Sequence, residues 1–331
     1  IGYPVLIRPS YVLGGRGMEI LSNDKQLEAY MEEAYLAPDR PLLIDEYLGN
    51  AIELDVDAVC DGEDVLIGAI MEHLEEAGIH SGDSTCFIPP QNIPEHVLAE
   101  VEDWTRRIGL ELGIRGCYNI QFAIRDEVLH VLEVNPRGSR TFPFVAKATG
   151  VPLARIAARL ALGDKLSELN VPEPQTDAVC VKAPVFPFIK LRGLDPAPGP
   201  EMKSTGEVMG SHARPAAAYL KARLATELPV PVEGGVYITV KDGDKLAIID
   251  EARRLQEMGF TLYATRGTAH VLRDVGGLDI QTCYRIAERR SPDALDLMRQ
   301  GKIHLVINTP RSTGGAILDG NMMRRLAVEL N

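Results

Sequence analysis

The chain has 331 residues, of which 45% are hydrophobic and 25% are charged, so it has the composition of a globular protein of about two domains. Its formal net charge of −12 leaves no basic surplus to neutralise phosphates, which argues against a nucleic-acid-binding protein. No apolar run has the length of a membrane span, and the five cysteines lack CxxC spacing, so we expect reduced thiols and a cytoplasmic protein.

The first half of the chain predicts an antiparallel α+β body over residues 1–165. Short apolar runs bounded by Gly, Pro and Asp predict its strands, and longer amphipathic segments predict its helices. The predicted strands are 5–8, 42–48, 51–59, 65–72, 118–125 and 128–136, and the predicted helices are 24–35, 95–112 and 144–162. The strand over 51–59 alternates strictly, which predicts a half-buried strand whose other face carries Glu53, Asp55 and Asp57.

The second half of the chain contains two segments with different sequence patterns. Prolines cluster between 166 and 235, and we expect connecting structure there. From 236 to 331 strands alternate with helices, which predicts a small, doubly wound parallel-sheet domain. Its predicted strands are 236–240, 261–265, 280–284 and 304–309, and its predicted helices are 244–258, 268–275 and 292–300.

The stretch VLEVNPRGSR, residues 131–140, carries the strongest chemical signal. Glu133 and Asn135 are two residues apart on a strand and so share a face, and Arg137 and Arg140 follow at once. Gln121 lies twelve residues before Glu133 on a predicted neighbouring strand. A three-residue loop would make them direct partners on one face, whereas a two-residue loop would point them to opposite faces. In the first case the three side chains could hold one or two Mg²⁺ ions; otherwise they form a polar sheet face.

Three further stretches could bind a nucleotide. Arg8 ends a strand just before the glycine-rich GGRG, 14–17, whose backbone amides could approach phosphate. The loop AGIHSGDS, 77–84, places His80 among small polar residues. Glu46 and Leu48 could hold a base, while Glu53 could accept ribose hydroxyls. Taken singly, each of these is as well explained by a turn, a solvated histidine or a surface acid.

Several motifs in fixed order resemble one family. RPSYVLGGRGMEI, GIHSGDS, GYNIQFA, EVNPRGSRTFPFVAKATGVPLA and STGEVMG together resemble the large subunit of carbamoyl-phosphate synthetase, in the second of its two ATP-grasp halves. The resemblance implies an ATP-grasp domain that lacks its N-terminal part, followed by a methylglyoxal-synthase-like allosteric domain that stops short of its last strand and helix. Because the chain opens without Met, inside a strand, we expect a missing upstream segment, and we therefore expect the isolated piece to lack activity.

The resemblance also implies roles for individual residues. Arg137 and Arg140 are expected near the transferred phosphoryl group, and Gln121, Glu133 and Asn135 are expected to hold metal. The residues expected to contact ATP are Arg8, Glu46, Leu48, Glu53, Gly78, Ile79, His80, Ser81, Gln121 and Glu133.

In the second domain the resemblance implies an effector site. Its expected residues are Lys245, Thr265, Thr268, Arg285, Asn308 and Thr309. Arg285 stands where some relatives have lysine, and Pro310 stands where some have a second threonine. The resemblance therefore does not identify which effector binds. A structural alternative is that Thr268 caps a helix, which we expect in any case. Methylglyoxal synthase activity is not expected, because its acidic motif is not evident.

The resemblance implies a ligase that phosphorylates carbamate with ATP, in pyrimidine and arginine biosynthesis. Its cofactors would be ATP and Mg²⁺ or Mn²⁺, with K⁺ as a further candidate. Its partners would be a glutaminase small subunit, the N-terminal half of the large subunit and a small effector, in an oligomer that contacts neither nucleic acid nor membrane. The alternatives are a non-catalytic nucleotide-binding regulatory module and another ATP-grasp enzyme such as biotin carboxylase, which the terminal domain disfavours.

Overall fold

The chain forms two compact units. A computed structural model describes residues 1–10, 12, 14–34, 41–188, 196–226, 230–309 and 315–330. The first unit comprises Ile1–Pro187 with Pro198–Glu227, and the second comprises Phe188–Ala197 with Leu228–Asn331.

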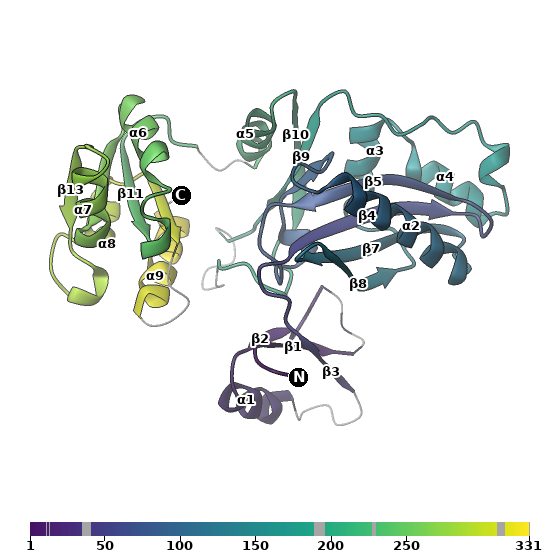
Figure 1. Ribbon diagram of the computed structural model, residues 1–331, viewed down its shortest axis with the longest axis horizontal. Coiled ribbons are helices and arrows are strands. Elements are labelled where there is room, and N and C mark those ends of the chain that lie inside the picture. Colours follow the sequence, from purple (N-terminus) through teal and green to yellow (C-terminus); the bar gives the residue numbers. More distant parts are fainter. Residues whose placement is uncertain are drawn as a thin grey trace. The chain divides into compact units, whose positions relative to one another are not determined.

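A small sheet begins the first unit. It contains β1 (Val5–Pro9), β2 (Glu19–Leu21) and β3 (Leu42–Glu46) in the antiparallel order β2-β1-β3. Helix α1 (Asp24–Ala34) lies beside this sheet, apart from the larger sheet of the same unit (Figure 1). Val5, Ile7 and Leu21 form its apolar core, so the alternation along β1 fixes which face is buried.

A seven-stranded antiparallel sheet forms the rest of the unit, in the order β10-β9-β6-β5-β4-β7-β8. Its strands are β4 (Ile52–Cys60), β5 (Val65–His73), β6 (Cys86–Ile88), β7 (Gly116–Arg125), β8 (Val128–Asn135), β9 (Val179–Val185) and β10 (Gly206–His212). Its helices are α2 (Glu95–Glu111), α3 (Phe142–Thr149), α4 (Leu153–Ala161) and α5 (Pro215–Ala225), with short 3₁₀ turns η1 (Ser81–Asp83) and η2 (Leu166–Glu168). The predicted antiparallel α+β body is therefore confirmed.

Two cores hold helices on opposite faces of this sheet. Leu54 and Val56 of β4 pack with Val97 and Val101 of α2. On the other face, Val59 belongs to the cluster that contains the apolar side of α3 and α4. Since residues two apart on a strand share a face, the acids of β4 lie on the side that α3 and α4 cover.

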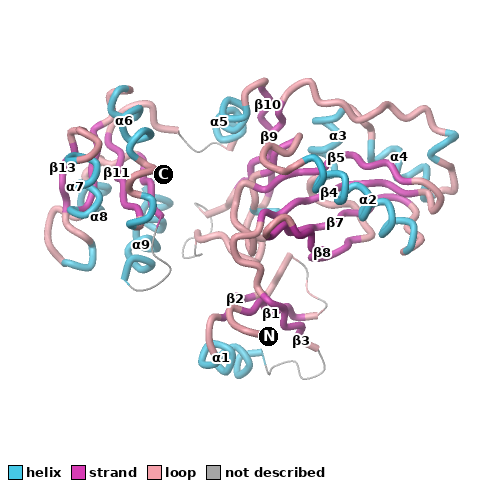
Figure 2. Tube along the Cα trace, viewed as in Figure 1, coloured by secondary structure: helices cyan, strands magenta, loops and turns pink. Residues whose placement is uncertain are grey.

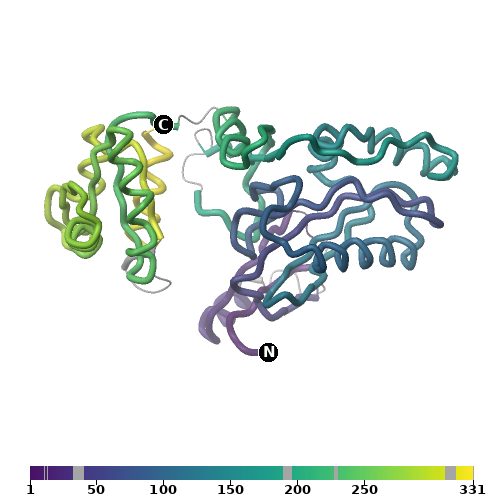
Figure 3. The backbone as a smooth tube through the Cα atoms, turned by 45° about the horizontal axis from the view of Figure 1, so that its top comes forward, coloured from purple at the N-terminus to yellow at the C-terminus, as the bar shows by residue number. Residues whose placement is uncertain are grey.

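Three expectations for the first unit are wrong. The stretch 166–235 is not only a connection, because it supplies β9, β10 and α5, and β9 pairs with β6 in the large sheet. Figure 3 traces this stretch in teal to green. The predicted helix 144–162 is two helices, because Gly150 adopts a left-handed conformation and Pro152 follows it. The acidic face of β4 is buried throughout, with Asp57 fully inaccessible to solvent.

The second unit contains the predicted parallel sheet, whose four strands have the order β13-β12-β11-β14. Its strands are β11 (Gly235–Val240), β12 (Thr261–Thr265), β13 (Ile280–Cys283) and β14 (Leu305–Thr309). Its helices are α6 (Ile249–Glu257), α7 (Arg266–Asp274), α8 (Ala294–Arg299) and α9 (Gly315–Leu330), with 3₁₀ turns η3 (Asp242–Asp244) and η4 (Ile286–Glu288). Separate cores join α6 and α7 to one face and α8 and α9 to the other, so the sheet is doubly wound. Figure 2 shows the helices of this unit in cyan and its strands in magenta.

Within the described residues, no helix has both the length and the apolar character needed to cross a membrane. The five cysteines are free thiols, and all except Cys117 are buried.

Candidate functional site

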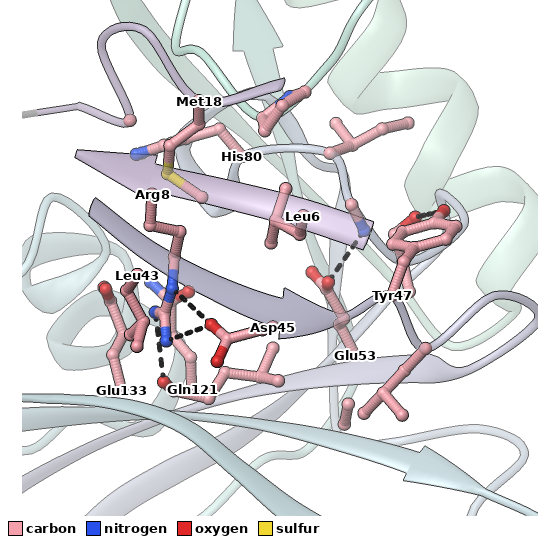
Figure 4. Close-up of a pocket in the computed structure, with 18 of the residues that line it drawn as sticks. Leu6, Arg8, Met18, Leu43, Asp45, Tyr47, Glu53, His80, Gln121 and Glu133 are labelled. Atoms are coloured by element: carbon pink, nitrogen blue, oxygen red, sulfur yellow. Dashed lines mark hydrogen bonds and ion pairs between the residues drawn. The ribbon is translucent and has the colours of Figure 1, made fainter. Parts of the chain in front are cut away.

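A cavity of about 690 Å³ lies in the first unit, lined by residues of the small sheet and by β4, β7 and β8 of the large sheet. It collects all the nucleotide and metal residues expected from the sequence except Ser81 and Arg140. Those that line it are Arg8, Glu46, Leu48, Glu53, Gly78, Ile79, His80, Gln121, Glu133, Asn135 and Arg137. Figure 4 shows Arg8, Gln121 and Glu133 converging on one end and Tyr47 and Glu53 at the other.

Gln121 and Glu133 are direct cross-strand partners, as the one-face hypothesis requires. The turn between β7 and β8 nevertheless has only two residues, Asp126 and Glu127, both with positive φ. This is the loop length for which opposite faces were expected. An irregularity between Gln121 and Phe122 changes the outcome: Phe122 pairs with Val131 and Gln121 with Glu133, so the intervening residue of β8 is extra. This β-bulge restores the shared face.

Glu133, Asn135 and Arg137 form a hydrogen-bonded row at the end of β8. Asn135 Nδ2 donates to Glu133 Oε1 at 2.7 Å, and Arg137 donates to Asn135 Oδ1 at 3.3 Å. Nearby, Gln121 Nε2 donates to Ser81 Oγ at 3.0 Å. The side-chain oxygens of this set are hard donors that suit Mg²⁺ or Mn²⁺.

These residues fit a divalent ion only as partial ligands. Across the described part of the chain, no three His, Cys, Asp or Glu side chains gather as a metal site. One carboxylate and two amides would leave most coordination positions of a Mg²⁺ ion to water and to nucleotide phosphates, which is how this ion is commonly held.

Arg8 lies at the same end of the cavity, and a carboxylate already engages its guanidinium. Its Nε and Nη2 each lie 2.8 Å from Asp45 Oδ2, and Nη1 donates to the carbonyl of Leu132 at 3.4 Å. The guanidinium thus bridges β3 and the bulge of β8. Asp45 was not predicted as its partner. The two residues lie diagonally across β1 and β3, where Arg8 pairs with Leu43 and Leu6 with Asp45, and this register cannot be read from the sequence.

The other end of the cavity, beside Tyr47 and Glu53, is shaped by backbone groups and carboxylates. Glu53 Oε1 accepts a hydrogen bond from the amide of Gly78 at 2.9 Å, and the Tyr47 hydroxyl donates to the carbonyl of Ala77 at 2.6 Å. These bonds fix the loop that carries Ile79. Glu46 is engaged by Arg125, which also lines the cavity and donates to Glu46 Oε1 at 3.1 and 3.2 Å.

A buried lysine that was not predicted from the sequence holds the loop of His80 and Ser81. Lys182 on β9 is fully buried, and its Nζ donates to the carbonyl of Ser81 at 3.0 Å. Burial would lower the pKa of Lys182, but Cys86, Glu207 and Asp55 raise it, so the ammonium form persists. His80 is itself an acceptor for the amide of Gly82, and burial lowers the pKa of its imidazole.

The glycine-rich loop closes on a distant segment. The carbonyl of Gly14 accepts a hydrogen bond from the amide of Met202 at 2.9 Å. Gly15 has φ +66°, and a Cβ there would collide with the carbonyl of Pro200. The loop therefore needs glycine both for its conformation and for this close approach.

Arg140 points to the same segment instead of lining the cavity. Its Nη1 donates to Ser204 Oγ at 2.6 Å, and the amides of Lys203 and Ser204 donate to Asp83, each at 2.8 Å. The two arginines of the NPRGSR stretch are therefore placed differently: Arg137 lines the cavity, whereas Arg140 is bonded to Ser204 and does not line it.

A buried ion pair lies under the cavity floor. His73 Nε2 is 3.1 Å from Asp55 Oδ2, and His73 Nδ1 is 3.5 Å from Glu53 Oε2. Burial raises the pKa of Asp55, but the bond to His73 and the charge of Lys182 outweigh it and lower that pKa. Burial alone would lower the pKa of His73, yet Cys86, Asp55 and Glu53 raise it well above its ordinary value.

In the second unit, the expected effector residues lie at the carboxyl edge of the parallel sheet. Thr265 ends β12, while Asn308 and Thr309 end β14, and the two strands flank β11. Lys245 reaches this edge, because a Cβ on Gly267 would lie 3.1 Å from its Nζ. The remaining two residues are Arg285, which follows β13, and Thr268, which is buried in α7.

The structure corrects one detail of this edge. Thr268 does not cap the helix, because α7 begins at Arg266 and its N-cap residue is Thr265, whose side chain makes no capping hydrogen bond. Lys245 is paired with Asp242 at 2.7 Å, which holds its ammonium close to the start of α7.

Comparison with known families gives one match for each unit. The family described as "Carbamoyl-phosphate synthase L chain, ATP binding domain" matches residues 1–169. The family described as "MGS-like domain" matches residues 247–331.

Two curated relatives match along the whole chain. The carbamoyl phosphate synthase large chain of Methanothermobacter thermautotrophicus is 51% identical over 335 residues, which cover 100% of this chain and 31% of that protein. The "Carbamoyl phosphate synthase large chain, C-terminal section" of Methanocaldococcus jannaschii is 51% identical over 342 residues, which cover 100% of this chain and 55% of that protein. The chain thus spans less than two thirds of the length of either relative.

Among solved structures, a biotin carboxylase from Campylobacter jejuni in a β,γ-ATP complex has a TM-score of 0.50 and 15% identity, covering 65% of this chain and 55% of that one. At this identity the likeness shows a shared fold alone.

Proposed function

The chain belongs to the carbamoyl-phosphate synthase large-chain ATP-binding family, and from this premise we propose that it forms the part of a synthase that transfers a phosphoryl group from ATP to carbamate. One observation carries the proposal: Gln121, Glu133 and Asn135 share a face at the end of the cavity where Arg8 and Arg137 also lie. Such a set of oxygen donors beside guanidinium groups suits a metal-bound triphosphate.

The chemistry asked of these residues is placement and charge neutralisation. A carbamate oxygen attacks the γ-phosphorus of ATP, a new P–O bond forms, and the bond from that phosphorus to the β-phosphate bridging oxygen breaks. ADP leaves with the electron pair. Carbamate is already an anion, so no general base is needed. Arg8 and Arg137 would stabilise the phosphoryl oxygens, and Mg²⁺ or Mn²⁺ held by Gln121, Glu133 and Asn135 would neutralise further charge.

At the other end, Glu46, Leu48 and Glu53 would hold the adenosine, and the backbone of Gly78 and Ile79 would close over it. Glu53 already accepts the amide of Gly78, so ribose hydroxyls would share this carboxylate. The loop at 14–17 would exclude water, which matters because carbamate is labile.

The second unit would bind a small anionic effector at the edge formed by Lys245, Thr265 and Asn308. A lysine ammonium close to a helix start favours a phosphate group. The chain would act in the cytoplasm, together with the N-terminal section of the large chain and a glutaminase subunit, and K⁺ would be a further cofactor. Family membership supports these assignments. The name of the relative from Methanocaldococcus jannaschii, a C-terminal section, supports the first partner.

The decisive test uses the intact synthase that contains this chain. The enzyme is supplied with carbamoyl phosphate and MgADP, and ATP formation is measured. Glu133→Gln should abolish most of this activity, whereas the control Glu127→Gln, in the exposed β7–β8 turn, should keep it. Absence of ATP with the unaltered enzyme would favour the alternative of a non-catalytic nucleotide-binding module.

For the effector site, Lys245→Ala should remove the response of the synthase to its effector and leave its activity without effector intact. The control is Lys302→Ala, an exposed lysine just before β14, at the opposite edge of the sheet. Equal loss of response in both variants would contradict an effector site at Lys245.

A further inference from the structure

The acidic face of β4 is only partly explained by a nucleotide site. Glu53, Asp55 and Asp57 are 8%, 2% and 0% exposed. Glu53 lines the cavity and Asp55 pairs with His73, but Asp57 contacts neither the cavity nor a cation that the structure records. A carboxylate taken fully out of water is costly, so its hydrogen-bond partners show what it holds in place.

Those partners belong to the arginine-bearing loop. Asp57 Oδ2 accepts hydrogen bonds from Ser139 Oγ at 2.8 Å and from Thr141 Oγ1 at 2.7 Å, and the two hydroxyls lie 2.9 Å apart. Asp57 Oδ1 accepts from Asn119 Nδ2 at 3.0 Å. A single buried carboxylate on β4 therefore ties down both residues that flank Arg140.

The loop is otherwise held through its two arginines, of which Arg140 donates to Ser204 Oγ at 2.6 Å. It runs over 136–141 between the end of β8 and the start of α3. Arg137 bonds within the loop and to its neighbour Asn135, through its own amide at 2.8 Å and its guanidinium at 3.3 Å. Asn119, the other partner of Asp57, is the residue opposite Asn135 across β7 and β8. Asp57 thus touches the strand pair and the loop at the point where the arginines leave the sheet.

We propose that Asp57 is a positioning residue for phosphoryl transfer, which acts by clamping Ser139 and Thr141 and so setting where Arg137 and Arg140 point. The inference rests on the proposed function of the cavity. Hydrogen bonds to an ionised acceptor are stronger than neutral ones, so this clamp is stiffer than a loop held by hydroxyls alone. Asp57 lies beneath the loop and touches no reacting atom.

The geometry separates Asp57 from its neighbour Asp55. Asn119 Nδ2 lies 3.3 Å from Asp55 Oδ1 and 3.0 Å from Asp57 Oδ1, so it bridges the two acids. Asp55 nevertheless faces His73, under the adenosine end. Loss of Asp57 should therefore affect the phosphoryl end and spare the binding of adenosine.

The test measures turnover and nucleotide affinity separately in the intact synthase. Asp57→Asn keeps the shape but loses the charge, and we expect the rate of ATP formation from carbamoyl phosphate and MgADP to fall about 100-fold, as expected when reacting groups are displaced by about 1 Å. The dissociation constant of ADP alone should change by less than about threefold, because the adenosine contacts remain. A merely structural role would weaken both together.

The matched control is Asp61→Asn. Asp61 is 2% exposed and accepts hydrogen bonds from the amides of Glu63, Asp64 and Leu166, away from the arginine loop. The Asp61→Asn enzyme should unfold more readily than the unaltered enzyme, yet its folded form should keep the unaltered turnover.

If Asp57→Asn does not fold, the milder Thr141→Val removes one hydroxyl only and should lower turnover about tenfold, with ADP affinity retained. Wild-type turnover in a folded Asp57→Asn or Thr141→Val enzyme would overturn the proposal. An inactive unaltered synthase would instead refute the function on which it rests, so the two failures are distinguishable.

Discussion

Gln121 and Glu133 face each other across β7 and β8 because β8 carries one residue more than β7 between them and the turn. The bulge both aligns the two side chains and turns the carbonyl of Leu132 toward Arg8, which donates to it. One irregularity in the ladder thus connects the metal-binding face with the arginine of the small sheet.

This pairing predicts that Gln121 and Glu133 act on one ion. Gln121→Ala and Glu133→Ala should each weaken binding of Mn²⁺ in the presence of ADP, by about 10- to 100-fold. The double variant should lose much less than the product of the two single losses, since each single change already spoils the same site. Electron paramagnetic resonance of Mn²⁺ measures this, and strictly multiplicative losses would show that the two residues act separately.

The pairing of Arg8 with Asp45 predicts a competition with phosphate. Asp45→Asn should release the guanidinium and tighten ADP binding severalfold, while Arg8→Ala should weaken it. Because the Arg8 and Asp45 side chains are 27% and 38% exposed, the ion pair should contribute at most about 1 kcal/mol to stability. Calorimetric titration with ADP, together with denaturant unfolding, separates the two effects; weaker ADP binding by Asp45→Asn would show that the carboxylate helps to orient Arg8.

The burial of Asp57 predicts a pH-dependent stability. Burial, opposed by the bonds from Thr141 and Ser139, raises the pKa of Asp57 to about 6. The charged or titratable groups that face it are Asp55 on its own strand and Cys117 on β7. A folded-state pKa above the unfolded one means that the folded protein binds more protons, so this stabilisation is complete at low pH and is lost as the pH rises through about 6.

Between pH 5 and 7.5 this loss should be about 1 kcal/mol in the free energy of unfolding, and Asp57→Asn should abolish it. The measurement is the difference between wild type and variant at each pH, which removes the contribution of other groups. A difference that does not change across this range would mean that the carboxyl titrates elsewhere.

The glycine-rich loop predicts a contrast between two glycines of similar conformation. Gly15 and Gly113 have φ of +66° and +61°, but a Cβ at Gly113 has nothing within 4 Å, whereas one at Gly15 meets Pro200. Gly113→Ala should therefore cost only the backbone strain, about 1 kcal/mol.

Gly15→Ala should also prevent the loop from docking, and it should raise the KM for MgADP and admit water to the site. Hydrolysis of ATP without product formation is the readout. Equal behaviour of the two variants would mean that the contact with Pro200 has no role in closure.

Sequence periodicity predicts most strands of both units, since alternation and short apolar runs are local properties. It fails where partners are remote: β9 and β10 lie in a proline-rich stretch, and β9 joins the sheet by pairing with β6, which is far away in the sequence. The same limit hid Lys182, whose role depends on a strand far along the chain.

The candidate site shows a similar division. Residue types and family resemblance identify the cavity wall, but the bulge of β8 leaves no sign in the composition. The acids at Asp55 and Asp57 have the spacing of a solvated face, and only the packing of the 136–141 loop and α3 over them reveals that they are buried.

The position of β9 and β10 in the sequence, after residue 165, has a practical consequence for isolating the ATP-binding body. A cut at residue 165 would strip two strands from the sheet and expose the backbone edge of β6, an open template for aggregation. A soluble excised body would have to extend at least to the end of α5, at Ala225.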